Sequence, residues 1–215
     1  MKLPADAIAK LAHLQSIDDS KIAASERYCD LLIEANRRIN LISRVGSVER
    51  EIERQFLLSI AILPFLPLSR LRWIDVGSGG GFPAIPLAIL RPGDQFDLVE
   101  SVAKKAFFLE RTCDALAISN VAVRNCRIED AISRGTLELP YDWMTAKAVT
   151  GWQECLRWAE HLLAAGGQLA TYKPSSPSES ELLMVCKAGF ELVDELSIRH
   201  IVPDVGTRII IMRKA

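Results

Sequence analysis

The stretch IDVGSGGGFPAIPLAIL, residues 74–90, decides the expected fold of this chain. It reads as a short apolar strand, a glycine-rich turn and the start of a helix. Gly77, Gly79, Gly80 and Gly81 let the backbone turn sharply and approach a ligand, because glycine carries no Cβ. The helix that follows would direct its free N–H groups at that ligand. The stretch therefore predicts a ligand-binding loop at the carboxyl end of a strand.

Two classes of ligand fit this loop, and the acidic residue before it separates them. Residues 79–84 match the dinucleotide fingerprint, with Glu100 at about the expected distance. However, a carboxylate at Asp75 would repel a pyrophosphate, whereas it would favour the ammonium and sulfonium groups of S-adenosylmethionine. Asp75 also begins an Asp-x-Gly-x-Gly pattern with Gly77 and Gly79, the usual methyltransferase form. The loop favours S-adenosylmethionine and leaves a nicotinamide dinucleotide as the alternative.

The ends of the next two expected strands carry further candidate contacts. Glu100 could accept both ribose hydroxyls in a bidentate way, or it could be a solvated charge at a strand end. In methyltransferases an acidic residue after the third strand commonly meets the adenine amino group, with an apolar neighbour against the ring. Glu129 with Ile128 could serve in this way. The alternative is a helix N-terminus at which Glu129 and Asp130 suit the helix dipole.

Short apolar strands alternate with helical stretches from residue 71 onward. The expected strands are residues 72–76, 95–99, 121–124, 143–146, 167–172, 191–197 and 208–213. This rhythm predicts βαβ units and a parallel, doubly wound sheet. Only a loop separates the last two strands, so they should pair as an antiparallel hairpin. The expected α/β fold is the Rossmann-like arrangement of class I methyltransferases.

The first seventy residues predict helices. Apolar positions between Ile22 and Ile39 recur at helical spacing after Asp18, and a second amphipathic segment covers residues 48–63 and stops at Pro64. We expect residues 1–70 to form a helical extension packed on a cofactor-binding core of residues 71–215.

Composition limits the classes of function. The 215 residues include 26 basic and 27 acidic side chains, so nucleic-acid binding would have to depend on local patches. The five cysteines are scattered without a Cys-x-x-Cys pair, which is typical of reduced thiols. No metal-ligand cluster, apolar leader or bilayer-length apolar run is visible. The sequence predicts a cytoplasmic protein without a membrane span or a metal.

A family resemblance makes the prediction more specific. The loop continuation at residues 82–89, the segment 99–101 with residues 104–109, and Glu129 together resemble the RsmG family, also called glucose-inhibited division protein B. The resemblance covers most of the chain, with residues 74–129 carrying the specificity. It implies transfer of a methyl group from S-adenosylmethionine to N7 of a guanine in 16S ribosomal RNA.

The loop and the resemblance together imply a set of cofactor contacts. The candidates are Asp75, Gly77, Ser78, Gly79, Gly81, Phe82, Glu100, Ser101, Ile128, Glu129 and Lys147. Three positions depart from the family pattern: Lys147 stands for the arginine of a Ser-Arg-Ala motif, and Gln55 and Leu58 stand for histidine and aspartate. Lysine keeps the charge but loses the planar fork of arginine.

The expected chemistry needs no general base. Guanine N7 offers a lone pair and carries no proton, so catalysis can rest on orientation, which removes roughly 7–11 kcal/mol in favourable systems. The sequence identifies no catalytic residue. Lys147 is a candidate for positioning the cofactor or the target, and the alternative is a surface lysine at a strand end.

A target base in folded RNA must be splayed out, and its phosphates need positive partners. The candidate RNA contacts are Arg37, Arg38, Arg44, Lys104, Lys105, Lys173 and Arg208. Such charges can equally be solvated faces. The expected partner is 16S rRNA or the small ribosomal subunit, and the expected state is a monomer. The alternatives are a methyltransferase of another RNA or of a small molecule, an NAD-dependent oxidoreductase and a non-catalytic RNA-binding assembly factor.

Overall fold

The computed structural model describes residues 1–4, 8, 17–42, 46–199 and 206–215. Within them, seven strands form one sheet in the order β3-β2-β1-β4-β5-β7-β6. The strands are β1 (Arg72–Val76), β2 (Gln95–Val99), β3 (Val121–Arg124), β4 (Tyr141–Lys147), β5 (Leu163–Lys173), β6 (Phe190–Ser197) and β7 (Arg208–Lys214). Neighbours among β1 to β5 run parallel, whereas β7 pairs antiparallel with both β5 and β6. The predicted doubly wound sheet with a C-terminal antiparallel pair is confirmed.

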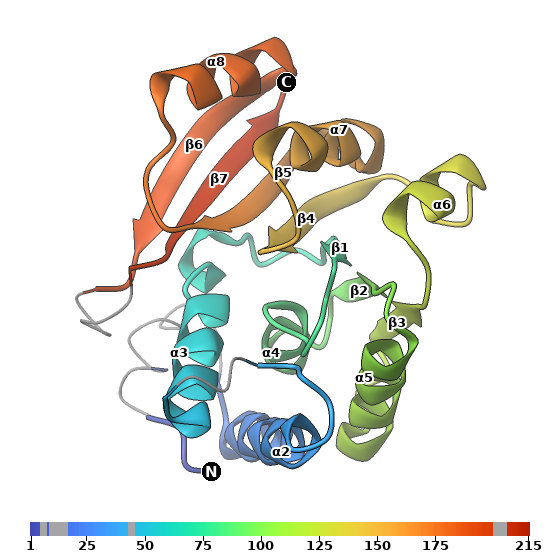
Figure 1. The fold of residues 1–215 in the computed structure, drawn as a ribbon, viewed down its shortest axis with the longest axis vertical. Coiled ribbons are helices and arrows are strands. Elements are labelled where there is room, and N and C mark those ends of the chain that lie inside the picture. The colour runs from blue at the N-terminus through green and yellow to red at the C-terminus, as the bar shows by residue number, and fades with distance from the viewer. Residues whose placement is uncertain (5–7, 9–16, 43–45, 200–205) are drawn as a thin grey trace.

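Helices cover both faces of the sheet (Figure 1). They are α2 (Asp19–Asn36), α3 (Val48–Ile60), α4 (Ala84–Leu90), α5 (Ala103–Leu116), α6 (Ile128–Ser133), α7 (Trp152–Leu162) and α8 (Glu179–Lys187), with a 3₁₀ turn η1 (Leu63–Phe65). Residues of α2 to α5 share one apolar cluster, and those of α6 to α8 share a second cluster. The two clusters lie on opposite faces because side chains alternate along each strand.

β1, β2 and β3 have the expected bounds, and three other strands begin earlier than expected, β6 by one residue only. β4 begins at Tyr141 and β5 at Leu163, whereas the predicted strands began at residues 143 and 167. These two residues pair with each other across an irregularity in the ladder. The glycines at 166 and 167 interrupt the β-strand pattern in the sequence, but pairing with a neighbouring strand overrides such local signals.

Both N-terminal helices begin where a side chain caps them. Asp18 accepts a hydrogen bond from the backbone N–H of Lys21 at 2.9 Å, and Ser47 accepts one from that of Arg50 at 3.3 Å. α3 ends at Ile60, three residues before the predicted end, and Pro64 lies in the 3₁₀ turn, where it needs no donor.

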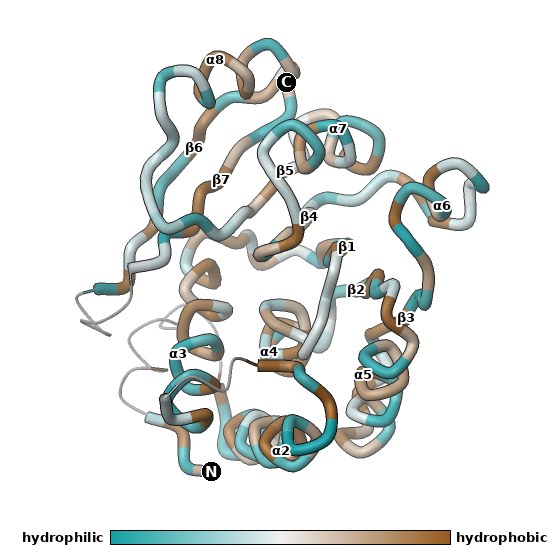
Figure 2. The backbone as a smooth tube through the Cα atoms, viewed as in Figure 1, coloured by the Kyte–Doolittle hydropathy of each residue, from teal (hydrophilic) through white to brown (hydrophobic). Residues whose placement is uncertain are grey.

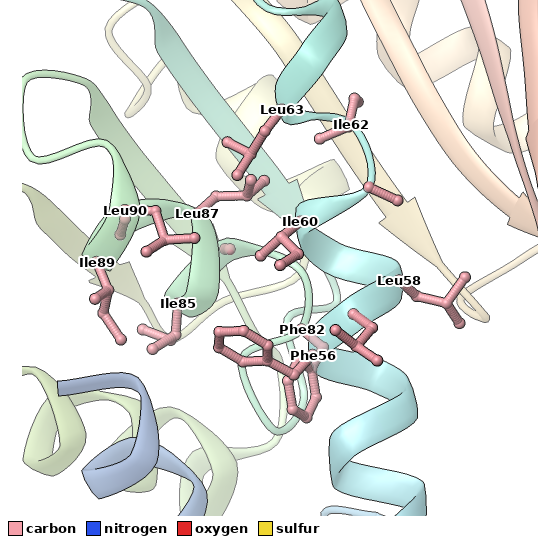
Figure 3. Packing of buried hydrophobic residues seen from close by; sticks show 14 of the residues in the cluster. Phe56, Leu58, Ile60, Ile62, Leu63, Phe82, Ile85, Leu87, Ile89 and Leu90 are labelled. Carbon is pink, nitrogen blue, oxygen red and sulfur yellow. The ribbon is translucent and has the colours of Figure 1, made fainter. Parts of the chain in front are cut away.

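The N-terminal helices pack against the sheet through an apolar layer. Phe56 and Ile60 on α3 face Phe82 and Ile85 around the start of α4 (Figure 3). Hydrophilic and hydrophobic positions alternate around the turns of α2 and α5 (Figure 2), as expected of helices with one buried face. The boundary between an extension and a core at residues 70 and 71 stays a prediction, since both parts contribute to this cluster. None of the helices in the described ranges is long and apolar enough to cross a membrane.

Candidate functional site

The glycine loop lies at a topological switch point of the sheet. It follows β1, and the chain leaves β1 toward β2 on one side, whereas β4 pairs with β1 on the other. Ligands of open α/β sheets bind in the crevice at this point, outside the carboxyl ends of the strands. The fold therefore places the loop at the expected binding edge.

A pocket of about 240 Å³ opens beside the loop, between the carboxyl ends of β1 to β4 and helix α7. Four of the predicted cofactor residues line it: Gly77, Ser101, Ile128 and Glu129. The β4–α7 connection and α7 complete the wall with Val149, Thr150, Glu154 and Trp158, which the sequence did not single out. These four residues follow β4 in the chain, and no local motif marks them.

The loop conformation requires glycine at two positions. Gly77 has φ +71° and Gly81 has φ +100°, and a Cβ at either would lie 2.6 Å from a side-chain carbon, of Val149 and of Ile85 respectively. The Tyr28 hydroxyl of α2 donates to the carbonyl oxygen of Gly80 at 2.7 Å. An N-terminal helix thus helps to hold the loop in its turned conformation.

The Glu100 side chain is buried and hydrogen-bonded to the glycine loop, so it is not a solvated charge. It is 5% exposed, and its two carboxylate oxygens accept the backbone N–H groups of Gly79 at 2.8 Å and Val102 at 2.7 Å. Each carboxylate oxygen can accept a second hydrogen bond. Glu100 can therefore hold the loop and still accept hydroxyls from a ligand.

Asp75 provides a buried negative charge under the same loop. It is 2% exposed; its Oδ1 accepts the Thr145 hydroxyl at 2.5 Å, and its Oδ2 has no partner among the described residues. Burial raises the pKa of Asp75 to about 6, although the hydrogen bond from Thr145 favours the charged form. A buried acceptor without a partner is costly, so this carboxylate fits a site that receives a cation.

Lys147 is not among the residues that line this pocket. Its Nζ donates to Oε1 of Gln55 on α3 at 2.6 Å and lies 5.0 Å from the ring centre of Phe82 and 5.8 Å from that of Tyr172. Burial lowers the pKa of Lys147 to about 7, against the opposing effect of the Asp75 carboxylate. Lys147 is thus a partly buried residue that contacts α3, and the alternative of a surface lysine is wrong.

The partner of Lys147 belongs to a polar network on α3. Gln55 donates from Nε2 to Glu51 at 2.6 Å, and Arg54 donates to Glu51 from Nε at 2.8 Å and to the Thr207 hydroxyl at 3.4 Å. The network joins the end of β4 to the start of β7 through an N-terminal helix. Sequence reasoning missed Glu51 and Arg54, because their spacing on α3 is also that of an ordinary surface ion pair.

Two of the predicted cofactor residues, Ser78 and Phe82, lie in or beside the glycine loop. Leu58, which departs from the family pattern, lies in the apolar core. The Ser78 hydroxyl donates to the carbonyl oxygen of Asp75 at 3.0 Å, and Phe82 packs edge-on against Tyr28 with ring centres 5.3 Å apart. Leu58, the second departure on α3, is buried in the apolar cluster (Figure 3). The predicted contacts therefore fall into a pocket group, a loop group and an α3 group.

The predicted RNA contacts lie in two regions. Arg37 and Arg38 follow the end of α2, and Lys104 and Lys105 lie in the first turn of α5, which packs against α2. Arg44 lies outside the described residues.

The other two candidates lie near the C-terminal hairpin. Lys173 lies 5.0 Å from the ring centre of Trp152 and donates to the carbonyl oxygen of Thr150 at 3.5 Å. Arg208 pairs with Glu195 at 2.5 Å, which offsets its charge. In the part of the chain that the structure describes, no cluster of three metal-ligating side chains is present.

Comparison with known proteins gives a consistent picture. A family profile described as "GidB: rRNA small subunit methyltransferase G" matches residues 21–201. Ribosomal RNA small subunit methyltransferase G of Carboxydothermus hydrogenoformans is 36% identical over 181 residues, covering 84% of this chain and 76% of that protein. The protein of the same name from Solibacter usitatus is 32% identical over 197 residues, covering 86% and 90%.

Solved structures support the fold alone. The cyclase SpnF superposes with a TM-score of 0.60 at 16% identity, over 91% of this chain and 96% of that one. A precorrin-6y C5,15-methyltransferase from Geobacter metallireducens superposes with a TM-score of 0.55 at 14% identity, over 80% and 92%.

Proposed function

Because the chain belongs to the rRNA small subunit methyltransferase G family, we propose that it transfers the methyl group of S-adenosylmethionine to N7 of a guanine in 16S rRNA. Membership gives the activity as methylation of small-subunit rRNA. The cofactor, the atom and the site residues are what the proposal adds. The proposal rejects the alternative of an NAD-dependent oxidoreductase.

The observation that carries the cofactor assignment is the buried, half-unpaired carboxylate of Asp75. A cationic ligand would supply the missing partner, whereas a pyrophosphate would be repelled. S-adenosylmethionine fits, because it brings both an ammonium and a sulfonium and supplies an electrophilic methyl group.

Each group of residues would have a separate part in binding. Asp75 would attract the ammonium, Glu100 would accept ribose hydroxyls, and Glu129 with Ile128 would take the adenine. The glycine loop allows close approach, and Val149 packs against Gly77 at the edge of the pocket.

In this proposal, catalysis depends on the orientation of the target base relative to the methyl donor. Guanine N7 needs no base, so the chain has to bind the target, align it and keep water out. Lys147 would act as a positioning residue by holding α3 and Phe82 at the end of β4. The phosphates would meet Arg37, Arg38, Arg44, Lys104, Lys105, Lys173 and Arg208. We further propose a monomer acting in the cytoplasm on 16S rRNA or on the small subunit.

The test is methyl transfer from tritiated S-adenosylmethionine to 16S RNA or 30S subunits from cells that lack the N7 methyl group. We expect label at one guanine N7, lost at least tenfold in Asp75→Asn and retained in Asp19→Asn, which changes an exposed carboxylate. Label on another atom would contradict the N7 assignment. Absence of label with intact S-adenosylhomocysteine binding would favour a non-catalytic assembly factor.

A further inference from the structure

A second hollow lies between α2 and α5 and shares no lining residue with the cofactor pocket. Its volume is about 550 Å³, within the range of roughly 300–1,000 Å³ that suits a small organic group. The floor is mostly apolar and consists of Leu31, Ala35, Ile39 and Phe108 together with the buried Thr112. The rim is polar and carries Glu34, Arg38 and Arg111 beside Phe107. We refer to this hollow as the α2–α5 groove.

Phe107 is the unusual member of the groove. It is 61% exposed, although it is a large aromatic residue. Lys104, Phe107 and Arg111 recur at helical spacing, so they lie along one face of α5. An exposed aromatic ring between two cationic side chains is typical of surfaces on which nucleic-acid bases stack.

The charges of the groove indicate where each part of a nucleotide would lie. Arg38 lies just after the end of α2 and Arg111 lies on α5, so a guanidinium group lines the groove from each side. The 3.6 Å ion pair of Arg111 with Asp114 is exposed and therefore holds Arg111 only weakly. Glu34 would repel a phosphate but could accept a hydrogen bond from the amino or imino group of a base.

We propose that the α2–α5 groove binds one unpaired nucleotide of the rRNA substrate, with its base on Phe107 and its flanking phosphates on Arg38 and Arg111. The inference rests on the proposed function for the identity of the RNA. It also joins the two basic clusters, at the end of α2 and the start of α5, into one surface. The groove is separate from the methyl-transfer site, so it sets the affinity for RNA and leaves the chemical step unchanged.

The test uses Phe107→Ala, Arg38→Ala and Arg111→Ala, all at exposed positions, with Phe65→Ala and Arg213→Ala as controls on other exposed surfaces. For each variant we would measure the affinity for protein-free 16S RNA across a salt series. S-adenosylhomocysteine affinity, thermal stability and methyl transfer at saturating RNA would be measured alongside.

Loss of one stacked base predicts that Phe107→Ala binds RNA about 5- to 100-fold more weakly, with an unchanged salt slope. Each arginine variant should reduce the slope of log affinity against log salt by about 0.7. All variants should keep their S-adenosylhomocysteine affinity, and Phe107→Ala and Arg111→Ala should keep their turnover at saturating RNA. If Phe107 were needed only for folding, Phe107→Ala would instead lower thermal stability, S-adenosylhomocysteine affinity and turnover together with RNA affinity.

Two outcomes would overturn the inference. If wild-type protein methylates 16S rRNA and Phe107→Ala binds protein-free RNA as tightly as the Phe65→Ala control, the groove does not hold RNA and the proposed function stands. If Phe107→Ala weakens binding to 30S subunits only, the occupant is a ribosomal protein. If the RNA affinities shift as expected but wild-type protein labels no rRNA, the groove stands and the proposed function fails.

Discussion

At the scale of single residues, burial shifts the pKa values of two groups of the site in the direction that favours their neutral forms. Asp75 has its pKa raised to about 6 and Lys147 has its pKa lowered to about 7, each mainly by desolvation. Both groups therefore titrate near physiological pH, where their charges matter for a cationic cofactor.

Binding of S-adenosylhomocysteine should weaken as the pH falls through 6. Asp75 attracts the ammonium only when ionised, while the ammonium itself stays charged over this range. Titration calorimetry should show about tenfold weaker binding at pH 5 than the ionised limit. Asp75→Asn should bind weakly and should not show the tenfold fall below pH 6. An unchanged slope in that variant would assign the pH dependence to another group.

The buried lysine should make stability rise with pH in alkaline solution. The folded-state pKa of Lys147 is about 7 and lies below its value of 10.5 in the unfolded chain, so the unfolded state binds more protons between these values. The Tm of wild type relative to Lys147→Met should therefore increase from pH 7 to pH 10, by several degrees. Lys187→Met, at an exposed lysine, should show no such trend.

Glu100 should be needed as an acceptor and not only as a charge. In Glu100→Gln the amide nitrogen cannot accept, so either the Gly79 or the Val102 N–H loses its partner. We expect a loss of about 1–3 kcal/mol in the free energy of unfolding in urea. Glu138→Gln, at an exposed glutamate, should change it by less than about 0.5 kcal/mol. Equal effects in both variants would contradict the loop-holding role.

At the scale of elements, helix α3 is coupled to the end of β4. Gln55 accepts from Lys147 and donates to Glu51, so one side chain connects a buried amine with the helix network. α3 also supplies Phe56 and Ile60 to the apolar layer around Phe82 (Figure 3). The N-terminal helices are thus part of the site's support.

Removal of Gln55 should leave the Lys147 amine without its acceptor. Gln55→Ala should lower the free energy of unfolding by about 1–3 kcal/mol, and the loss should largely disappear in a Lys147→Met background. Gln153→Ala, at an exposed glutamine on α7, serves as the control. Additive effects of the two substitutions would show that the pair is not coupled.

At the scale of the whole molecule, residues before and after position 70 share one apolar cluster. Tyr28, Leu32 and Phe56 are buried together with Trp73 and Phe82. A helical extension of this kind cannot separate from the sheet without exposing that layer to water. We therefore expect one cooperative unfolding transition.

Hydrogen exchange measures this cooperativity directly. Amides of α2 and of β4 should open with the same free energy in native-state exchange followed by mass spectrometry. The fragment 71–215 alone should lack a cooperative transition. Exchange of α2 at a much lower free energy than β4 would instead make residues 1–70 an independent unit.

The sequence by itself determined the features that depend on residues close to one another along the chain. β1, β2 and β3 have their predicted bounds, and the glycine loop follows β1 as expected, because alternation, glycine content and caps are local signals. Gly77, Ser101, Ile128 and Glu129 line one pocket, because the carboxyl ends of parallel strands meet at one edge.

Only the tertiary structure decided which distant residues meet. Gln55 and Lys147 are 92 positions apart, and no periodicity relates them. The α2–α5 groove likewise forms only where two helices pack side by side. The early starts of β4 and β5 depend on pairing between Tyr141 and Leu163. The physical reason is the same in all three cases. Packing and burial act between elements, and one stretch of sequence contains only one of the two partners of each contact.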